Sequence, residues 1–340
     1  MEIINYAPQV GQIERLTQDR IVKLFCDKLH YRYLGNWKDR QKNSNIEENL
    51  LKKYLQGTGK YSDRLISKAI GELKKTAGNQ QSTLYEINKE IYERLRYGIS
   101  LHEEPGEPSQ KLHFIDWDYP ENNQFAVAEE VTIKGQRNKR PDIVLYINGI
   151  AVGVLELKRS TVAVSEGIRQ NIGNQTDNYI KPFFTTVQLM IAGNDTEGLR
   201  YATTETKEDY YLSWSPKDPL FADEPNLLDR QLMQLCNKER LLEIIHDFII
   251  FDSGIKKICR HNQYFGVKAA QENARKREGG IIWHTQGSGK SLTMVWLANW
   301  IRENITDARV ILLTDRIELD QQIEGVFLGV NAKIYRTKNS

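Results

Sequence analysis

The chain has 340 residues, which is long enough for two domains that each bury a core. Its composition, 40% hydrophobic and 27% charged, is that of an ordinary globular protein and excludes bulk disorder and collagen-like structure. The net charge is only +2, and residues 251–340 carry 14 Lys and Arg against 9 Asp and Glu, so charge alone does not indicate nucleic-acid binding.

The sequence also argues against a membrane-bound or secreted protein. The most apolar stretch, 241–251, is interrupted by charged and polar side chains and is too short for a bilayer span. The opening MEIINYAPQVGQIE lacks the basic segment of a secretory signal. Cys26, Cys236 and Cys259 lie far apart, which favours neither a disulfide framework nor a zinc site. We therefore expect a protein of the reducing cytoplasm with no membrane partner.

Hydrophobic periodicity predicts a helix-rich opening followed by strands. Asn148-Gly149 between two apolar runs is a strong hairpin signal. In chain order we expect helices over 17–30, 46–55, 65–73 and 82–101, strands over 124–133, 143–147 and 150–157, a helix over 165–179, a strand over 186–192, and one or two helices over 227–251.

From about residue 259 the order changes to strand, glycine loop, helix and strand. The strands are expected over 280–283 and 310–313, with the helix over 291–303 between them. This order is typical of the beginning of a parallel α/β domain. We therefore predict a first domain over 1–240 and a second, incomplete one over 241–340.

The glycine loop has the composition of a phosphate-binding loop. In HTQGSGKS, which begins at His284 where the usual pattern has Gly, Gly287 and Gly289 let the backbone wrap a phosphate at a helix N-terminus. Lys290 is expected to reach the β- and γ-phosphates and Ser291 to bind Mg²⁺. The predicted ATP-binding residues are Arg260, Gln263, Thr285, Gly287, Ser288, Gly289, Lys290 and Ser291.

Two further features bear on the nucleotide. Gln263 lies 27 residues before Lys290, and its amide can pair with both the acceptor and the donor edge of adenine. After Asp315, no hydrophobic run ends in the Asp-Glu pair that hydrolases use to hold Mg²⁺ and orient water. We expect a truncated chain that binds ATP without turning it over.

A second constellation joins Asp142 to Glu156 and Lys158. Asp142 opens the first strand of the predicted hairpin, and Glu156 and Lys158 end the second strand on one face. A strict two-residue turn places Asp142 opposite Leu155, which sends Glu156 to the other face. A shift of one residue, by a β-bulge or a three-residue loop, pairs Asp142 with Glu156, and we predict that shift.

Converging carboxylates favour a hard cation between them, and a neighbouring lysine can orient or deprotonate an attacking water. This pattern resembles the PD-(D/E)xK nuclease superfamily. Gln175 and Tyr179, four residues apart, are predicted to share a helix face as in the Gln-x-x-x-Tyr element of one nuclease branch. Glu90, or nearly as well Glu86, is a candidate for the helix carboxylate that several such nucleases add. Candidate DNA-phosphate contacts precede Asp142: Lys134, Arg137, Lys139 and Arg140.

The order of these motifs is similar to the amino-terminal part of the restriction (motor) subunit of type I restriction–modification enzymes. The segments EGIRQNIGNQ, KPFFTTVQLMIAGND, WHTQGSGKSLTM and TDRIELDQQI are typical of that family. The resemblance implies an α/β fold in which a PD-(D/E)xK nuclease domain, a mixed central sheet flanked by helices, precedes a partial RecA-like lobe of a superfamily 2 motor.

The resemblance further implies a type I site-specific deoxyribonuclease that translocates double-stranded DNA with ATP and Mg²⁺, together with methyltransferase and specificity subunits. Asp142 and Glu156 would hold Mg²⁺, Lys158 would serve the water, and Gln175 and Tyr179 would support the site. Two alternatives stay open. One is a DNA-repair helicase–nuclease, and the other is a nucleotide-switched DNA-binding module with an inert nuclease fold.

Overall fold

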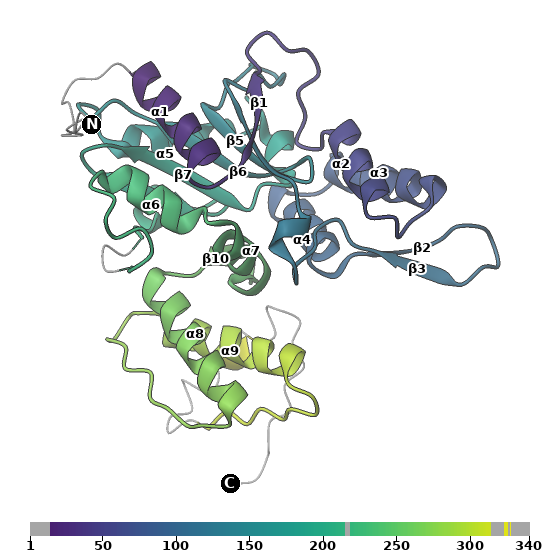
Figure 1. Cartoon of the computed structure of the whole chain (residues 1–340), viewed down its shortest axis with the longest axis vertical. Helices are drawn as coiled ribbons and strands as arrows, with labels where there is room; N and C mark the ends of the chain where they lie inside the picture. Colours follow the sequence, from purple (N-terminus) through teal and green to yellow (C-terminus); the bar gives the residue numbers. More distant parts are fainter. Residues whose placement is uncertain (1–13, 215–217, 314–322, 326, 328–340) are drawn as a thin grey trace. The chain divides into compact units, whose positions relative to one another are not determined.

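The computed structural model describes residues 14–214, 218–313, 323–325 and 327. The chain divides into two compact units, Met1–Leu242 and Glu243–Ser340 (Figure 1). Within the described residues, no helix has both the length and the apolar character that a membrane span requires.

A six-stranded mixed sheet forms the centre of the first unit, in the order β1-β4-β5-β6-β7-β8. β1 pairs with β4 and β6 with β7 in parallel, whereas the other neighbours are antiparallel. The strands are β1 (Arg32–Asn36), β4 (Phe125–Glu129), β5 (Ile143–Ile147), β6 (Ile150–Leu157), β7 (Leu189–Asn194) and β8 (Gly198–Ala202). A mixed sheet flanked by helices confirms the coarse fold prediction.

Helices cover both faces of this sheet. On one face, α5 packs Val164 and Ile168 on Ala192 of β7, and Ala192 lies beside Glu156 in the parallel register. On the other face, α1 reaches Glu129 of β4 through Gln18. The helices of this unit are α1 (Glu14–Asp27), α2 (Glu48–Gly57), α3 (Asp63–Ala77), α4 (Leu84–Tyr97), α5 (Val164–Asn174) and α6 (Leu227–Leu235), joined by the short 3₁₀ turns η1 (Pro120–Asn122), η2 (Lys181–Thr185) and η3 (Glu208–Tyr210).

The strand directions bring several chain segments to one edge of the sheet, by which we mean the side formed by the ends of the strands. β1, β4, β6 and β7 all end at the edge where β5 begins, because β5 runs antiparallel to both of its neighbours. Asp142 immediately precedes β5, and Glu156 is the residue before the last one of β6. This edge therefore holds the predicted carboxylates.

A helical layer and a small hairpin complete the first unit. α2, α3 and α4 pack in sequence, and Asn88 of α4 donates to three backbone carbonyls around η2, which attaches this layer to the sheet. The hairpin of β2 (Ile99–His102) and β3 (Ser109–Leu112) follows α4. β1 was not predicted, since the sequence over 32–36 has no run of alternating apolar residues. The helix predicted over 82–101 is wrong at its end, because the chain leaves the helix at Gly98, which has φ of 75°, and residues 99–102 form β2.

The second unit is built around two packed helices. It contains the hairpin of β9 (Ile249–Asp252) and β10 (Ile255–Ile258) and the helices α8 (His261–Lys276) and α9 (Lys290–Asn304), and α7 (Lys238–Asp247) runs across the unit boundary. Phe248 packs its ring on Tyr264 and Trp296.

The strands predicted over 280–283 and 310–313 do not form in the described residues. A parallel strand needs neighbours and covered faces, and these apolar side chains are exposed instead, with Trp283 at 90% and Leu313 at 92%. The partial RecA-like lobe therefore stays a prediction. The segment TDRIELDQQI, with Asp315, lies largely outside the described residues.

Candidate functional site

A bulge in the central hairpin brings the two predicted carboxylates together. Asn148 and Gly149 both have positive φ, as a tight two-residue hairpin turn requires. The register is regular up to Ala151 opposite Tyr146, then shifts so that Gly153 faces Leu145. Val152 is thus the extra residue, the next pairs continue to Ile143 opposite Leu155, and Asp142 falls opposite Glu156. The predicted register shift is confirmed.

Asp142 is held at this edge by one hydrogen bond from β6 and one from α1. Its Oδ2 accepts the Leu157 N–H at 2.7 Å, and its carbonyl oxygen accepts Gln18 Nε2 at 3.2 Å from α1. The side chain is nearly buried, and burial raises its pKa to about 6 against the opposing effects of the Leu157 N–H and the Lys158 ammonium.

Glu156 is fully buried and held by α5. Gln170 Nε2 donates to its Oε2 at 2.7 Å, and Asn174 Nδ2 donates to its Oε1 at 3.3 Å. Burial raises the pKa of Glu156 well above its usual range, and the facing carboxyl of Asp142, within hydrogen-bonding reach, raises it further.

One cation and a third carboxylate complete the cluster. Lys158 Nζ donates to the Leu157 carbonyl at 2.9 Å and lies 3.6 Å from Glu14 Oε1 of α1. Glu14 also raises the pKa of both Asp142 and Glu156. Three carboxyl groups around one ammonium leave an excess of negative charge, which is the environment that oxygen-coordinated cations prefer.

The Gln175–Tyr179 pair is not arranged as predicted, because α5 ends at Asn174 and the two residues share no helix face. The backbone turns there, with Ile180 N donating to the Asn174 carbonyl. Gln175 caps the helix and fastens it to Glu205, whose N–H it accepts at 2.8 Å. Tyr179 lies instead beneath Lys139, whose ammonium is 4.1 Å from the ring centroid.

Neither predicted helix carboxylate has a contact with this cluster among the described residues. Glu90 forms an exposed ion pair with Arg94 on α4, and Glu86 closes the capping box with Thr83 at the start of the same helix. The helix carboxylate beside Lys158 is Glu14. The hydrophobic periodicity of the sequence does not distinguish Glu14 from other surface glutamates, because only the packing of α1 places Glu14 beside Lys158.

Gln170 and Asn174 were also missed by the sequence reasoning. They are four residues apart on α5, so they lie on one helix face, and both point at the buried Glu156. The sequence does contain a signal for them, because Gln170 and Asn174 are polar residues at helical spacing on a helix whose apolar Ile168 packs on the sheet.

The basic turn before Asp142 is partly neutralised. Arg140 pairs with Glu130 and Lys139 covers Tyr179, whereas Lys134 and Arg137 are exposed without an ion-pair partner in the described part of the chain.

In the second unit, the glycine loop opens α9. Gly287 and Gly289 have φ of 77° and 80°, and Lys290 is the exposed first residue of the helix. Lys290 Nζ donates to the carbonyls of His284 and Thr285, at 3.3 and 3.0 Å. The lysine thus folds back over its own loop, at the end of a helix whose free N–H groups attract anions.

Gln263 fastens this loop to α8. Its Nε2 donates to the carbonyls of Ser288 and Gly289, each at 3.0 Å, and its Oε1 accepts the Arg260 N–H at 2.8 Å. The side chain is 2% exposed. In this arrangement its amide is occupied by the loop backbone, so adenine recognition by Gln263 stays a prediction, as do contacts of Arg260 and Ser291 with a nucleotide.

Two family models match the chain. One, described as the type I restriction enzyme R protein N terminus, matches residues 12–209, which is more than half of the chain. The chain belongs to this R-protein family. The other, described as SWI2/SNF2 ATPase, matches residues 262–340.

The curated relatives that the chain matches are designated type I restriction enzyme endonuclease subunits. A putative type I restriction enzyme MjaVIIIP endonuclease subunit of Methanocaldococcus jannaschii is 30% identical over 311 residues, covering 84% of this chain and 28% of the relative. The type I restriction enzyme HindI endonuclease subunit of Haemophilus influenzae is 27% identical over 294 residues, covering 79% and 28%. The chain thus spans only 28% of the length of each of these two relatives.

Both clusters fall inside the matched regions. The R-protein match includes Glu14, Asp142, Glu156 and Lys158, and the ATPase match begins one residue before Gln263 and includes the glycine loop. The structural units and the two family matches therefore agree in order along this R-protein chain.

Proposed function

We propose that the first unit is a Mg²⁺-dependent nuclease that hydrolyses DNA phosphodiesters, and that the second unit binds ATP as part of a DNA-translocating motor. The observation that carries the proposal is the pairing of Asp142 with Glu156 beside Lys158, which the Val152 bulge produces. The family membership and the relatives' designation as endonuclease subunits support the same function.

The donor set fits a hard divalent cation. Asp142 and Glu156 would hold Mg²⁺, since both are buried carboxyl groups that face each other, with Glu14 as a third carboxylate nearby. Such an ion supplies charge stabilisation to the phosphodiester that is cleaved. Gln170 and Asn174 orient Glu156, and the Leu157 N–H orients Asp142, so the two carboxylates are placed before any ligand arrives.

Lys158 has a separate role in this proposal. Its ammonium lies at the open edge of the sheet between Glu14 and the Leu157 carbonyl, where it can orient the attacking water. The water oxygen forms the new bond to phosphorus and gives up a proton to solvent, and one ester oxygen leaves with the electron pair of the broken bond and takes up a proton from solvent.

For the whole protein we propose the role of the restriction subunit of a type I system. It acts in the cytoplasm on double-stranded DNA, with modification methyltransferase and specificity subunits as partners. The ATPase match and the glycine loop support nucleotide binding by the second unit. We propose ATP-driven translocation for the complete subunit only.

Metal binding tests the nuclease proposal. We expect calorimetric titration with Mg²⁺ to show one site in the wild type and at least about tenfold weaker binding in Asp142→Ala, because one of two carboxylate ligands is lost. Glu166→Ala is the matched control, since Glu166 is exposed and pairs with Arg169 on the outer side of α5. Equal Mg²⁺ affinity in the wild type and Asp142→Ala would leave a nuclease fold without its metal site and favour an inert binding module.

A further inference from the structure

Two basic loops lie side by side at the edge of the sheet that holds the carboxylates. The first, loop A, is residues 38–43 after β1, and the second, loop B, is residues 132–140 between β4 and Asp142. Thr132 begins loop B and donates its Oγ1 to the Lys38 carbonyl at 2.8 Å, and its N–H donates to the Trp37 carbonyl at 3.4 Å. The start of loop B is therefore hydrogen-bonded to the start of loop A and to the residue before it.

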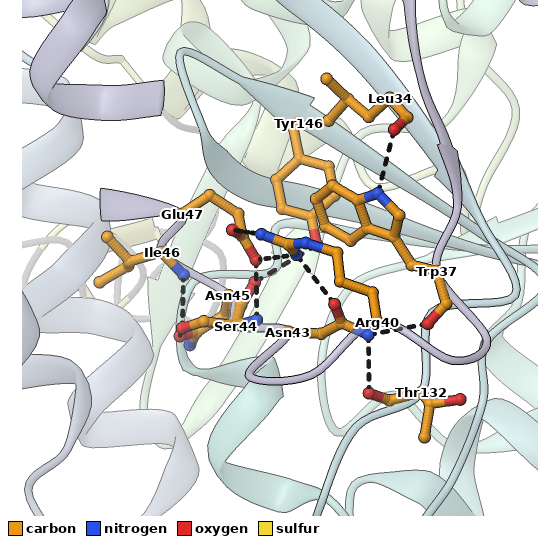
Figure 2. Close-up of polar contacts among 10 residues, drawn as sticks. All are labelled: Leu34, Trp37, Arg40, Asn43, Ser44, Asn45, Ile46, Glu47, Thr132 and Tyr146. Atoms are coloured by element: carbon orange, nitrogen blue, oxygen red, sulfur yellow. Dashed lines mark hydrogen bonds and ion pairs between the residues drawn. The ribbon is translucent and has the colours of Figure 1, made fainter. Parts of the chain in front are cut away.

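Asn43 is the second link between the loops. Its Nδ2 donates to the carbonyl of Thr132 at 2.9 Å and to that of Trp37 at 3.0 Å, and its Oδ1 accepts Arg40 Nη1 at 2.8 Å (Figure 2). The Asn43 side chain thus connects loop B, the residue before loop A and the Arg40 guanidinium.

Arg40 holds loop A against the sheet. Figure 2 shows its guanidinium beside the Trp37 ring, 3.8 Å from the centroid, and bonded to the buried carboxylate of Glu47. Trp37 in turn packs on Tyr146 of β5, and the Tyr146 hydroxyl donates to the Ser44 carbonyl. The charge of Arg40 is therefore used internally, and it fixes the course of the loop.

Loop B is fixed from its other side. A Cβ at Gly135 would lie 2.0 Å from the Tyr179 carbonyl oxygen, so only glycine allows this approach. Lys139 lies over the Tyr179 ring, and Arg140 pairs with Glu130. Both loops are thus rigidly supported by residues that lie beneath them.

The remaining charges of the two loops face solvent. Loops A and B together contain seven Lys and Arg and one acid, Asp39. Arg40 pairs with Glu47, Arg140 pairs with Glu130, and Lys139 lies over Tyr179. The other four cations are exposed and have no ion-pair partner in the residues that the structure describes: Lys38, Lys42, Lys134 and Arg137. Pre-ordered, unneutralised cations in adjacent loops are suited to a polyanion backbone.

We propose that loops A and B form one phosphate-binding surface that seats duplex DNA on the β1–β4 side of the carboxylate site. The inference rests on the proposed nuclease function and names where its substrate binds. Loop B runs directly into Asp142, so a duplex held on this surface passes next to the carboxylates. Neighbouring strands are about 4.8 Å apart, so β4 and β1 lie within one duplex width of β5.

Charge removal tests the surface. The readout is fluorescence anisotropy of a labelled duplex of about 30 base pairs, roughly three helical turns, in Ca²⁺ and over a range of salt concentrations. We expect Lys38→Ala/Lys42→Ala and Lys134→Ala/Arg137→Ala each to weaken binding roughly tenfold and to lower the slope of log Kd against log salt by about 2, since each pair removes two phosphate contacts.

The matched control removes two charges elsewhere. Lys53 on α2 and Lys60 after it are exposed, and Lys53→Ala/Lys60→Ala should leave affinity and slope unchanged. Asn43→Ala removes no charge but breaks the second link between the loops and the contact with Arg40, and it should weaken binding several-fold. Mg²⁺ titration of every variant separates the two proposals, because the carboxylates are untouched.

Wild-type Mg²⁺ binding with no effect of either loop pair on the duplex would overturn the surface and leave the nuclease proposal standing. An equal loss in the Lys53/Lys60 control would show a general charge effect and also overturn it. If a single strand or a duplex RNA of the same length bound as tightly as the DNA duplex and responded equally, the assignment to duplex DNA would be wrong.

Discussion

At the scale of single residues, the candidate nuclease site holds two carboxyl groups that repel each other when both are ionised. Asp142 and Glu156 face each other in a buried position, and burial holds the pKa of Asp142 at about 6 and that of Glu156 well above its usual range. Without a cation, ionising both carboxyl groups places like charges together where water solvates them poorly. A site built to bind a metal is therefore a source of instability when no metal is bound.

The pH dependence of stability follows from the sign of that shift. Because the folded-state pKa of Asp142 is raised above the unfolded value of 3.8, its contribution to stability is fully present below about pH 4 and is lost as the pH rises through about 6. Asp142→Asn cannot ionise but keeps an oxygen for the Leu157 N–H. We expect it to be more stable than the wild type at pH 8 in chelator, by on the order of 1–3 kcal/mol.

Denaturant unfolding at pH 5 and pH 8 measures this difference. Adding Mg²⁺ at pH 8 should raise the stability of the wild type and leave Asp142→Asn unchanged. Asp177→Asn is the control at an exposed carboxylate that pairs with Lys181. A wild-type stability that does not change between these pH values, together with a less stable Asp142→Asn, would contradict the electrostatic account.

At the scale of elements, the glycine loop depends on how tightly α8 and α9 pack. Gly289 has φ of 80°, and a Cβ there would lie 2.4 Å from Gln263 Nε2. Relieving that overlap requires Gln263 to move, which breaks its bonds to the Ser288 and Gly289 carbonyls. The shape of the loop therefore depends on one glycine and one glutamine from different elements.

Gly289→Ala should consequently weaken nucleotide binding. We expect the affinity for a fluorescent ATP analogue to fall by about tenfold or more, from backbone strain and the lost hydrogen bonds together. Gly254→Ala is the control, because Gly254 has φ of 83° in the β9–β10 turn but nothing within 4 Å of the added carbon. Unchanged affinity in Gly289→Ala would mean that this loop does not bind the phosphates.

At the scale of the whole molecule, the two units differ in how completely they bury their apolar residues. The sheet of the first unit is covered on both faces, and β5 and β6 are buried throughout. In the second unit, apolar side chains at two predicted strands are exposed among the described residues: Ile281 at 89%, Trp283 at 90%, Ile311 at 80% and Leu313 at 92%. Exposed apolar clusters of this kind bind other apolar surfaces.

We therefore expect the 340-residue chain to bind the dye ANS and to self-associate with rising concentration. Ile281→Ser/Trp283→Ser should lower both ANS fluorescence and the associated fraction in sedimentation velocity, because it removes apolar area from the surface. Tyr119→Ser/Tyr210→Ser, at exposed aromatic positions of the first unit, should change neither. If the two double variants behaved alike, the exposed segment around Ile281 and Trp283 would not be the associating surface.

The sequence by itself identified the two acids and the lysine of the candidate nuclease site and the hairpin that brings them together. Asp142, Glu156 and Lys158 were found from spacing, and the one-residue shift followed from strand alternation, because a period of two leaves only one register that puts both acids on one face. The turn at Asn148-Gly149 and the helix after the glycine loop also followed from local patterns. The mixed sheet, in contrast, was implied by the family resemblance.

Only the tertiary structure decided which distant residues contact Glu156 and Lys158. Glu14 in place of Glu90, and Gln170 with Asn174 in place of the predicted Gln175–Tyr179 pair, depend on how α1 and α5 pack on the sheet. The joining of loops A and B depends on β1 lying parallel to β4. Contacts across large sequence separations leave no period in the sequence, so they become visible only when the elements are packed.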